Sequence, residues 1–149
     1  MGSEPRRARP EDVEAIAALS RTARAEAMPW LPLLHTPEEE RDFFRWQVET
    51  GHEVWVVEVG GRVAGFASMH EGVLNHLYVA PEHQGHGIGD ALFARAKGSM
   101  PGGFRWHVFQ ANQRARRFYE ARGGVAIAFN ELGGEERLPE AIYEWRPAR

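Results

Sequence analysis

The spacing of apolar and polar positions predicts four helices in this chain. Apolar residues recur at helical spacing from Val13 to Ser20 and from Phe43 to Val48, as expected where one face of a helix packs on a core. Thr36-Pro37-Glu38-Glu39 has the features of a helix start: a capping side chain, a proline at the first helical position and acids in the first turn. Two further helices are predicted, one that follows Gly89 and ends near Gly98, and one from Asn112 to Arg122.

Runs of β-branched and aromatic residues predict about seven strands. Val54 to Val59 and Val63 to Met69 flank Gly60-Gly61, which is the signal of a hairpin. The other predicted strands are Arg6 to Arg9, Val73 to Val79, Phe104 to Phe109, Val125 to Phe129 and Ala141 to Trp145. The element order β-α-α-β-β-β-α-β-α-β-β predicts an α/β fold of the α+β type, with a mixed, mostly antiparallel sheet and helices on both of its faces. We find no repeat or linker, so we expect one domain over residues 1–149.

Composition narrows the class of protein. With 43% hydrophobic and 26% charged residues, the chain fits a globular domain and neither a disordered nor a membrane protein. A net charge of −3 argues against a nucleic-acid partner. The absence of cysteine excludes disulfides, thiolate zinc sites and a cysteine nucleophile. The polar start from Met1 to Pro10 is unlike a signal peptide, so we expect a cytoplasmic protein. Lys97 is the only lysine among 18 basic residues, a bias typical of GC-rich bacterial genomes.

The segment from Leu77 to Asp90 contains the most informative candidate site. A predicted strand ends at Pro81, and a turn with glycines at 85, 87 and 89 leads directly into a helix. Such glycines let successive backbone N–H groups converge on one point, and the helix start adds partial positive charge. An anion such as a pyrophosphate is therefore the expected ligand. A turn that uses glycine only for packing is an equally weighted alternative.

Several common motifs do not fit this segment. The Rossmann pattern needs glycine where Asp90 stands, and a P-loop needs a lysine that is not there. His83 and His86 have no third ligand at a recognised spacing, so no metal is expected. The chain has no Gly-x-Ser-x-Gly motif for serine hydrolysis.

The pattern that remains, Gln84-x-x-Gly87-x-Gly89, resembles the acetyl-CoA signature of the GNAT superfamily of N-acetyltransferases. A second block, Asn112-x-x-Ala115-x-x-Phe118-Tyr119-x-x-x-Gly123-Gly124, is similar to that family's Asn-x-x-Ala-x-x-Phe-Tyr-x-x-x-Gly-Phe. The predicted element order also matches the GNAT acyl-CoA N-acyltransferase fold over nearly the whole chain. The departures are Gly124 in place of phenylalanine, which predicts looser packing, and Asp90, which puts a carboxylate near the pyrophosphate.

The resemblance implies acetyl-CoA as cosubstrate, and no metal. Acetyl-CoA would lie in a V-shaped opening between strands 74–79 and 104–109, where a bulge frees backbone groups of Leu77 and Val79. The implied cofactor-binding residues are Leu77, Tyr78, Val79, Gln84, Gly85, His86, Gly87, Ile88, Gly89, Asp90, Asn112 and Tyr119.

Tyr119 would protonate the departing CoA thiolate, as the matching tyrosine does in the family. The alternative is a core aromatic beside Phe118. Because no cysteine can carry an acetyl group, we expect direct attack of an amine on the thioester in a ternary complex.

Three residues compete as the general base. Glu71 and His107 match positions that carry a base in some GNAT enzymes, whereas His76, on the strand before the glycine turn, matches no family motif. Histidine titrates at about 6.5 and glutamate at about 4.3, so glutamate needs burial to serve equally well. We expect Glu71 to act through water, with His107 close behind. The alternative for each is a purely structural role: Glu71 in a turn, either histidine in a polar contact of the sheet.

The expected acceptor is a primary amine of a small molecule or peptide, with no nucleic acid or membrane as partner. The resemblance places the acceptor pocket near Met28, Trp30 and His35, between the first two helices; ordinary loop packing is the alternative for these three. We also expect His76 to be a substrate-binding residue, although it matches no family motif. Glutamates favour a cationic amine unless they form a solvated face: Glu38, Glu39, Glu40, Glu135 and Glu136. The sequence does not decide between a monomer and a homodimer. The alternative function is a non-catalytic acyl-CoA-binding or sensing module, and a nucleotide-binding structural protein comes third.

Overall fold

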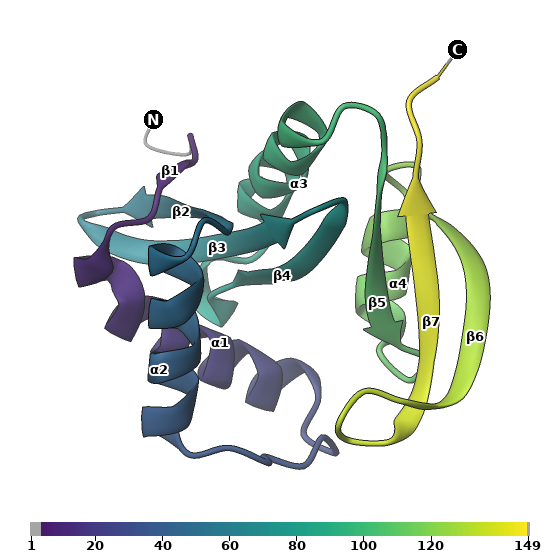
Figure 1. Ribbon diagram of the computed structural model, residues 1–149, viewed down its shortest axis with the longest axis horizontal. Helices are drawn as coiled ribbons and strands as arrows, with labels where there is room; N and C mark the ends of the chain where they lie inside the picture. Colours follow the sequence, from purple (N-terminus) through teal and green to yellow (C-terminus); the bar gives the residue numbers. More distant parts are fainter. Residues whose placement is uncertain (1–3, 149) are drawn as a thin grey trace.

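A sheet of seven strands runs through the protein in the computed structural model, which describes residues 4–148 (Figure 1). The strands lie in the order β1-β2-β3-β4-β5-β7-β6. Their bounds are β1 Arg6–Arg7, β2 Glu53–Val59, β3 Arg62–His70, β4 Val73–Val79, β5 Phe104–Phe109, β6 Val125–Gly133 and β7 Leu138–Trp145. All neighbours are antiparallel except β4 and β5, which are parallel. The predicted mixed, mostly antiparallel sheet is confirmed.

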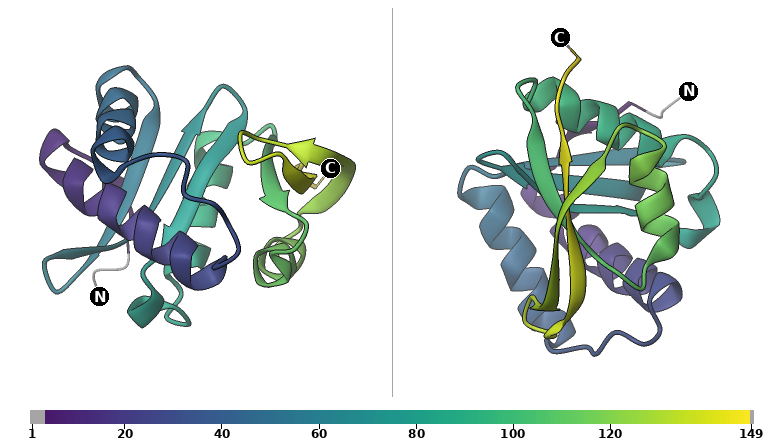
Figure 2. Two further views of the ribbon diagram at one scale, coloured as in Figure 1. Left: turned by 90° about the horizontal axis from the view of Figure 1, so that it is seen from below. Right: turned by 90° about the vertical axis from the view of Figure 1, so that its right-hand side faces the viewer.

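Helices cover both faces of the sheet, as predicted. Their bounds are α1 Val13–Ala27, α2 Pro37–Glu49, α3 Ile88–Ser99 and α4 Gln113–Glu120. Figure 1 shows α1 and α2 on one side of strands β2 to β4 and α3 on the other side. Figure 2 shows α4 beside the β5–β7–β6 part of the sheet. Short 3₁₀ turns, Pro10–Asp12 and Pro81–His83, precede α1 and the glycine turn.

The start of α2 follows the sequence signature closely. The hydroxyl of Thr36 accepts a hydrogen bond from the backbone N–H of Glu39 at 3.1 Å, and the Glu39 carboxylate accepts one from the N–H of Thr36 at 2.8 Å. This reciprocal capping satisfies two N–H groups that a helix start leaves without partners. The loop before α2 is thereby held in a defined direction.

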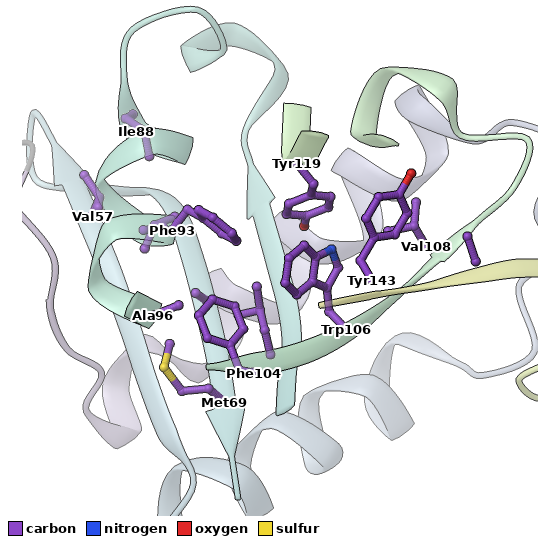
Figure 3. Packing of buried hydrophobic residues seen from close by; sticks show 14 of the residues in the cluster. Val57, Met69, Ile88, Phe93, Ala96, Phe104, Trp106, Val108, Tyr119 and Tyr143 are labelled. Atoms are coloured by element: carbon purple, nitrogen blue, oxygen red, sulfur yellow. The ribbon is translucent and has the colours of Figure 1, made fainter. Parts of the chain in front are cut away.

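Two apolar clusters hold the layers together. One lies between α1, α2 and the first strands and includes Ile16, Phe44 and Phe66. The other lies under α3 and α4 and includes Phe93 and Trp106 (Figure 3). Burial of such side chains stabilises a fold by about 1.5–3 kcal/mol each.

Gly124 does not loosen this second cluster, contrary to expectation. A Cβ atom at Gly124 would lie 2.9 Å from Cζ2 of Trp106 and 3.0 Å from the carbonyl oxygen of Tyr119. The Trp106 ring therefore occupies the space in which a larger residue at position 124 would sit. Glycine is required here because two aromatic residues approach the backbone.

The last two strands are longer than predicted and the first is shorter. β6 continues to Gly133 and β7 begins at Leu138, whereas the sequence pattern predicts shorter runs. A bulge between Asn130 and Gly133 breaks the alternation of apolar and polar positions in β6, which hides the end of the strand. β1 ends at Arg7 instead of Arg9, because the chain turns into the proline-led 3₁₀ helix at Pro10.

Candidate active site

The parallel strands β4 and β5 form a fork. Their register contains the pair Val73 and Arg105, after which the strands diverge (Figure 1). A bulge at Asn75 accompanies the divergence, because Ser68 of β3 faces His76 while Met69 faces Leu74. The opening expected between these strands is present, and its open end points toward the glycine turn and the start of α4.

A cavity of about 200 Å³ lies at the open end of the fork. Nine of the residues predicted to bind the cofactor line it: Leu77, Tyr78, Val79, Gln84, Gly85, Ile88, Gly89, Asn112 and Tyr119. His86, Gly87 and Asp90 are not among its lining residues. The two sequence blocks, 84–89 and 112–119, therefore meet at one cavity.

The glycine turn has the backbone conformation that its sequence predicts. Gly85 and Gly87 have φ values of +81° and +83°, in the left-handed region that favours glycine. Gly87 is the N-cap of α3. A Cβ at Gly89 would lie 3.0 Å from Cε1 of Phe118, so glycine lets α4 pack closely against the start of α3. The Gln84 side chain closes the turn by donating a hydrogen bond to the carbonyl of Val79 at 3.2 Å.

Asp90 does not place its carboxylate in this cavity. Its side chain forms an ion pair with Arg122, whose guanidinium also lies 3.8 Å above the ring of Phe118. This contact joins the first turn of α3 to the end of α4. The expected negative charge next to a pyrophosphate is thus neutralised by a partner.

Tyr119 is both part of the core and part of the cavity wall. Its ring centroid lies 4.9 Å from that of Trp106 and 5.7 Å from that of Phe93, as Figure 3 shows. The residue is only 8% exposed, and burial, with a further contribution from Tyr78, raises the pKa of its hydroxyl. The hydroxyl therefore stays protonated at neutral pH and can act as a proton donor.

Asn112 caps α4 with its side-chain oxygen, which accepts a hydrogen bond from the backbone N–H of Ala115 at 3.2 Å. This bond occupies the oxygen and leaves the amide NH₂ group of Asn112 available to the cavity that the residue lines.

A second cavity, of about 630 Å³, lies on the other side of Tyr78. Tyr78 is in the wall of both cavities. The apolar part of the second wall comes from Leu31, Phe43, Phe44 and Phe109. Its polar part includes Arg24, His35, His76, His107 and five carboxylates, those of Glu39, Glu40, Glu135, Glu136 and Glu140.

Of the residues predicted for the acceptor pocket between the first two helices, His35 lines the second cavity and Trp30 does not. The His35 Nε2 atom lies 3.1 Å from both carboxylate oxygens of Glu135, and this contact raises the pKa of His35. It joins the segment between α1 and α2 to the turn between β6 and β7. Trp30 is 43% exposed and packs edge-on against Phe109, with 5.9 Å between ring centroids.

Glu71, the favoured candidate for the general base, lies away from both cavities. It occupies the turn between β3 and β4 with a φ of +47°, and its side chain is 83% exposed. The 7 residues of β4 span about 20 Å, and they separate Glu71 from the open end of the fork. The physical setting of Glu71 is that of a solvated turn residue, and this geometry does not favour Glu71 as the general base.

Both candidate histidines line the second cavity. His76 Nδ1 lies 2.8 Å from the hydroxyl of Ser68, and burial, together with Arg24 and His52, lowers the pKa of His76 to about 4. His107 Nδ1 lies 2.9 Å from Oε1 of Glu140, and the His107 side chain is 55% exposed. Of these two candidate histidines, His107 is the one that pairs with a carboxylate at the cavity wall.

Several lining residues are missed by the sequence analysis. Arg114 and Phe118 line the first cavity, and both stand within the block from Asn112 to Gly124, so their proximity to the cofactor site could have been inferred. Arg24 and Glu140 line the second cavity. No local pattern marks these two residues, because α1 and β7 bring them there from distant parts of the chain.

The histidine pair of the glycine turn makes a local contact. His86 Nδ1 lies 3.2 Å from the carbonyl oxygen of His83. Within residues 4–148, no three His, Asp or Glu side chains are grouped closely enough to hold a metal ion. The helices described in that range include none with the length and apolar character needed to cross a membrane.

Comparison with known proteins identifies relatives of this architecture. The model of the acetyltransferase (GNAT) family matches residues 20–124. Apo-form YjaB from Escherichia coli is similar in structure, with a TM-score of 0.79 and 22% identity over 97% of this chain and 98% of that one. A ribosomal-protein-alanine N-acetyltransferase from Brucella melitensis has a TM-score of 0.76 and 20% identity, covering 96% of this chain and 99% of the other.

A third similar structure, the PaiA N-acetyltransferase from Thermoplasma acidophilum, was solved in complex with coenzyme A. Its TM-score is 0.70 at 17% identity, over 97% of this chain and 98% of that chain. None of the curated proteins compared with this sequence matches it. The family match spans most of the chain and contains both the glycine turn and the second block, residues 112–124. This chain therefore belongs to the acetyltransferase (GNAT) family.

Proposed function

We propose that the protein transfers the acetyl group of acetyl-CoA to a primary amine of a small molecule or peptide. The observation that carries this proposal is that two cavities share Tyr78 in their walls. One cavity joins the glycine turn to a buried tyrosine that can donate a proton. The other is larger and contains a histidine that can accept one.

The first cavity suits acetyl-CoA. The turn from Gln84 to Gly89 offers backbone N–H groups at the start of α3, where the helix dipole favours a pyrophosphate. The divergence of β4 from β5 leaves backbone groups near Leu77 and Val79 for the pantetheine arm, in the manner of an added strand. The coenzyme A complex of the PaiA neighbour supports this choice of cosubstrate.

The proposed reaction uses one residue from each cavity, Tyr119 from the first and His107 from the second. A free amine in the second cavity attacks the thioester carbonyl, a C–N bond forms, and the C–S bond breaks as the tetrahedral intermediate collapses. Tyr119 donates its hydroxyl proton to the CoA thiolate that leaves. His107 accepts, directly or through water, the proton that the amine must lose. No acetyl-enzyme is needed, since the chain has no cysteine to form one.

His107 is the preferred base among the candidates for physical reasons. Glu71 lies in an exposed turn, and a pKa of about 4 makes His76 a weak proton acceptor at neutral pH. A base works best when it titrates near the working pH, and histidine ordinarily does so.

A turnover assay with a panel of primary amines tests the proposal. Acetyl-CoA is incubated with the protein and each amine, and both free CoA and acetylated amine are measured. We expect equal amounts of the two products with at least one amine class. Tight acetyl-CoA binding without amine-dependent CoA release would instead support the non-catalytic sensing module.

A further inference from the structure

Glu140 lies in an unusual setting for a carboxylate. It is on β7, the strand between β5 and β6, and its side chain is only 9% exposed. Its Oε1 atom accepts hydrogen bonds from two directions: His107 Nδ1 lies at 2.9 Å, and the Asn130 side-chain nitrogen lies at 3.3 Å. Burial of a carboxylate lowers stability unless hydrogen-bond donors compensate for the lost water. His107 and Asn130 are therefore the partners that stabilise the Glu140 charge.

The sheet register brings the three residues together. Phe109 of β5 and Asn130 of β6 are the direct partners of Glu140, and His107 faces Ile142. His107 and Glu140 are therefore diagonal neighbours across two antiparallel strands, close enough for long side chains to meet. The contact is a consequence of the β5-β7-β6 order, which local sequence does not reveal.

Gly133 leaves the space in which the Glu140 side chain lies. A Cβ atom at position 133 would overlap Cδ and Oε1 of Glu140, so an alanine there would force the Glu140 side chain to move. The bulge between Asn130 and Gly133 brings this glycine to the carboxylate. The pocket for Glu140 is thus formed by a glycine and a bulge, both on the edge strand.

We propose that Glu140 is a positioning residue that holds the His107 ring with Nε2 as the proton-accepting atom toward the acceptor cavity. A carboxylate can only accept a hydrogen bond, so Nδ1 carries the proton in the neutral ring and Nε2 keeps its lone pair. The same contact fixes the ring plane and stabilises the imidazolium formed when His107 takes the proton of the amine. This role rests on the proposed function, in which His107 is the base.

Other charged groups share the wall with His107. The second cavity also contains Arg24, His35 and His76, and the carboxylates of Glu39, Glu40, Glu135 and Glu136. Glu40 pairs with Arg24 and Arg21, and Glu135 pairs with His35. On the strands that carry His107 and Glu140, Arg105 pairs with Glu144. Glu140 is the carboxylate that contacts the His107 ring.

The test compares Glu140→Gln with Glu144→Gln. Both residues lie on β7 and both glutamates have cationic or imidazole partners, but Glu144 lines neither cavity. We expect Glu140→Gln to lower kcat/KM for the amine by about 10- to 100-fold, as for other groups that orient a functional histidine. The acidic limb of its pH profile should move to lower pH, because a neutral amide no longer stabilises the protonated ring. Glu144→Gln should keep the wild-type rate and limb.

Gly133→Ala provides an independent geometric test. The added methyl group displaces the carboxylate without removing its charge, so the rate should fall while CoA affinity stays at the wild-type value. If this variant does not fold, Glu140→Gln alone decides. An unchanged pH limb and rate in Glu140→Gln would overturn the proposal, and so would equal losses in Glu140→Gln and Glu144→Gln.

A ring-nitrogen NMR titration separates this proposal from the function on which it rests. Nitrogen-15 spectra of the histidine rings, with His107 assigned through His107→Gln, report the tautomer without any substrate. We expect the Nδ1–H form in the wild type and its loss or a shifted titration in Glu140→Gln. A wild-type titration in that variant overturns the role of Glu140 even in an active enzyme. A shifted titration together with full activity of His107→Gln supports the orienting contact and overturns the base assignment.

Discussion

Val73 of β4 lies opposite Arg105 of β5 in parallel register, at the closed end of the fork between the two strands. From this pair the strands diverge toward the glycine turn on one side and the Asn112 cap on the other. The first and the second cavity both have Tyr78 in their walls, near the open end. Changes at the glycine turn should therefore affect CoA binding, whereas changes at Tyr119 should affect the transfer step.

Gly87→Val should weaken CoA binding by about ten-fold or more. At the φ of +83° that Gly87 adopts, a β-branched residue is strained by about 1–3 kcal/mol, so the turn must change its conformation. Nothing in the described part of the chain lies within 4 Å of the added Cβ position, and the effect is therefore one of backbone geometry. Titration calorimetry with CoA measures it.

Gly61→Val is the matched control for this variant. Gly61 has a φ of +77° and equally open surroundings, but it lies in the turn between β2 and β3 and lines neither cavity. We expect it to lower stability and leave CoA affinity unchanged. Equal CoA affinities in the two folded variants would contradict a pyrophosphate site at the glycine turn.

Tyr119→Phe should lower kcat by about 10²–10⁴-fold, the usual effect of losing a general acid. The ring contacts with Phe93 and Trp106 remain, so the melting temperature should stay close to that of the wild type. Burial raises the pKa of Tyr119, so its hydroxyl stays protonated below about pH 10. If the rate falls with rising pH below about pH 10, that fall therefore does not come from deprotonation of Tyr119.

Tyr143→Phe is the control for Tyr119→Phe, because we expect it to lower stability and leave kcat nearly unchanged. The Tyr143 hydroxyl accepts a hydrogen bond from Arg116 at 3.0 Å and donates one to Glu120, and it lines neither cavity. Its removal should cost about 0.5–1.5 kcal/mol of stability with little change in kcat. A Tyr119→Phe enzyme that keeps its rate, with chemistry limiting, would mean that another donor protonates the thiolate.

Stability should fall as the pH drops from about 6.5 to 4, in part because of His76. The pKa of His76 is lowered to about 4 in the folded protein, while an unfolded histidine titrates near 6.5. Between these values the unfolded chain binds the additional proton, so acidification favours unfolding, by as much as about 3 kcal/mol in total. The contribution of His76 to the free energy of unfolding is fully present above about pH 6.5.

Denaturant unfolding between pH 4 and 7 measures this dependence. His76→Gln should have a smaller slope of unfolding free energy against pH than the wild type. His86→Gln, which alters an exposed histidine of the glycine turn, should keep the wild-type slope. Identical slopes in all three proteins would show that burial does not suppress protonation of His76.

The elements of the fold follow from local sequence to a large extent. The capping residues at Thr36 and the glycines that end or begin helices are visible in the chain, and their elements are confirmed. The end of β6 is not visible, because the bulge near Gly133 breaks its alternation. Local signals thus predict capped helix starts and glycine turns more reliably than the extent of irregular strands.

The site was predictable only where its residues belong to a motif. Gln84, Gly89 and Tyr119 are brought to one cavity by two short blocks whose spacing the chain displays. Glu71 lies in the turn between β3 and β4, and the direction of that hairpin carries it away from both cavities. Glu140 meets His107 across 33 positions of sequence, through a strand order that no local pattern encodes.

Initial rates with acetyl-CoA and the best amine both varied test the central claim most directly, that the acetyl group passes straight from the first cavity to the second. The account predicts reciprocal plots that intersect, and one free CoA for each acetylated amine, because both substrates must be bound together. Parallel plots would indicate an acetyl-enzyme intermediate. Parallel plots, or CoA release that does not depend on the amine, would contradict direct transfer at the junction beside Tyr78.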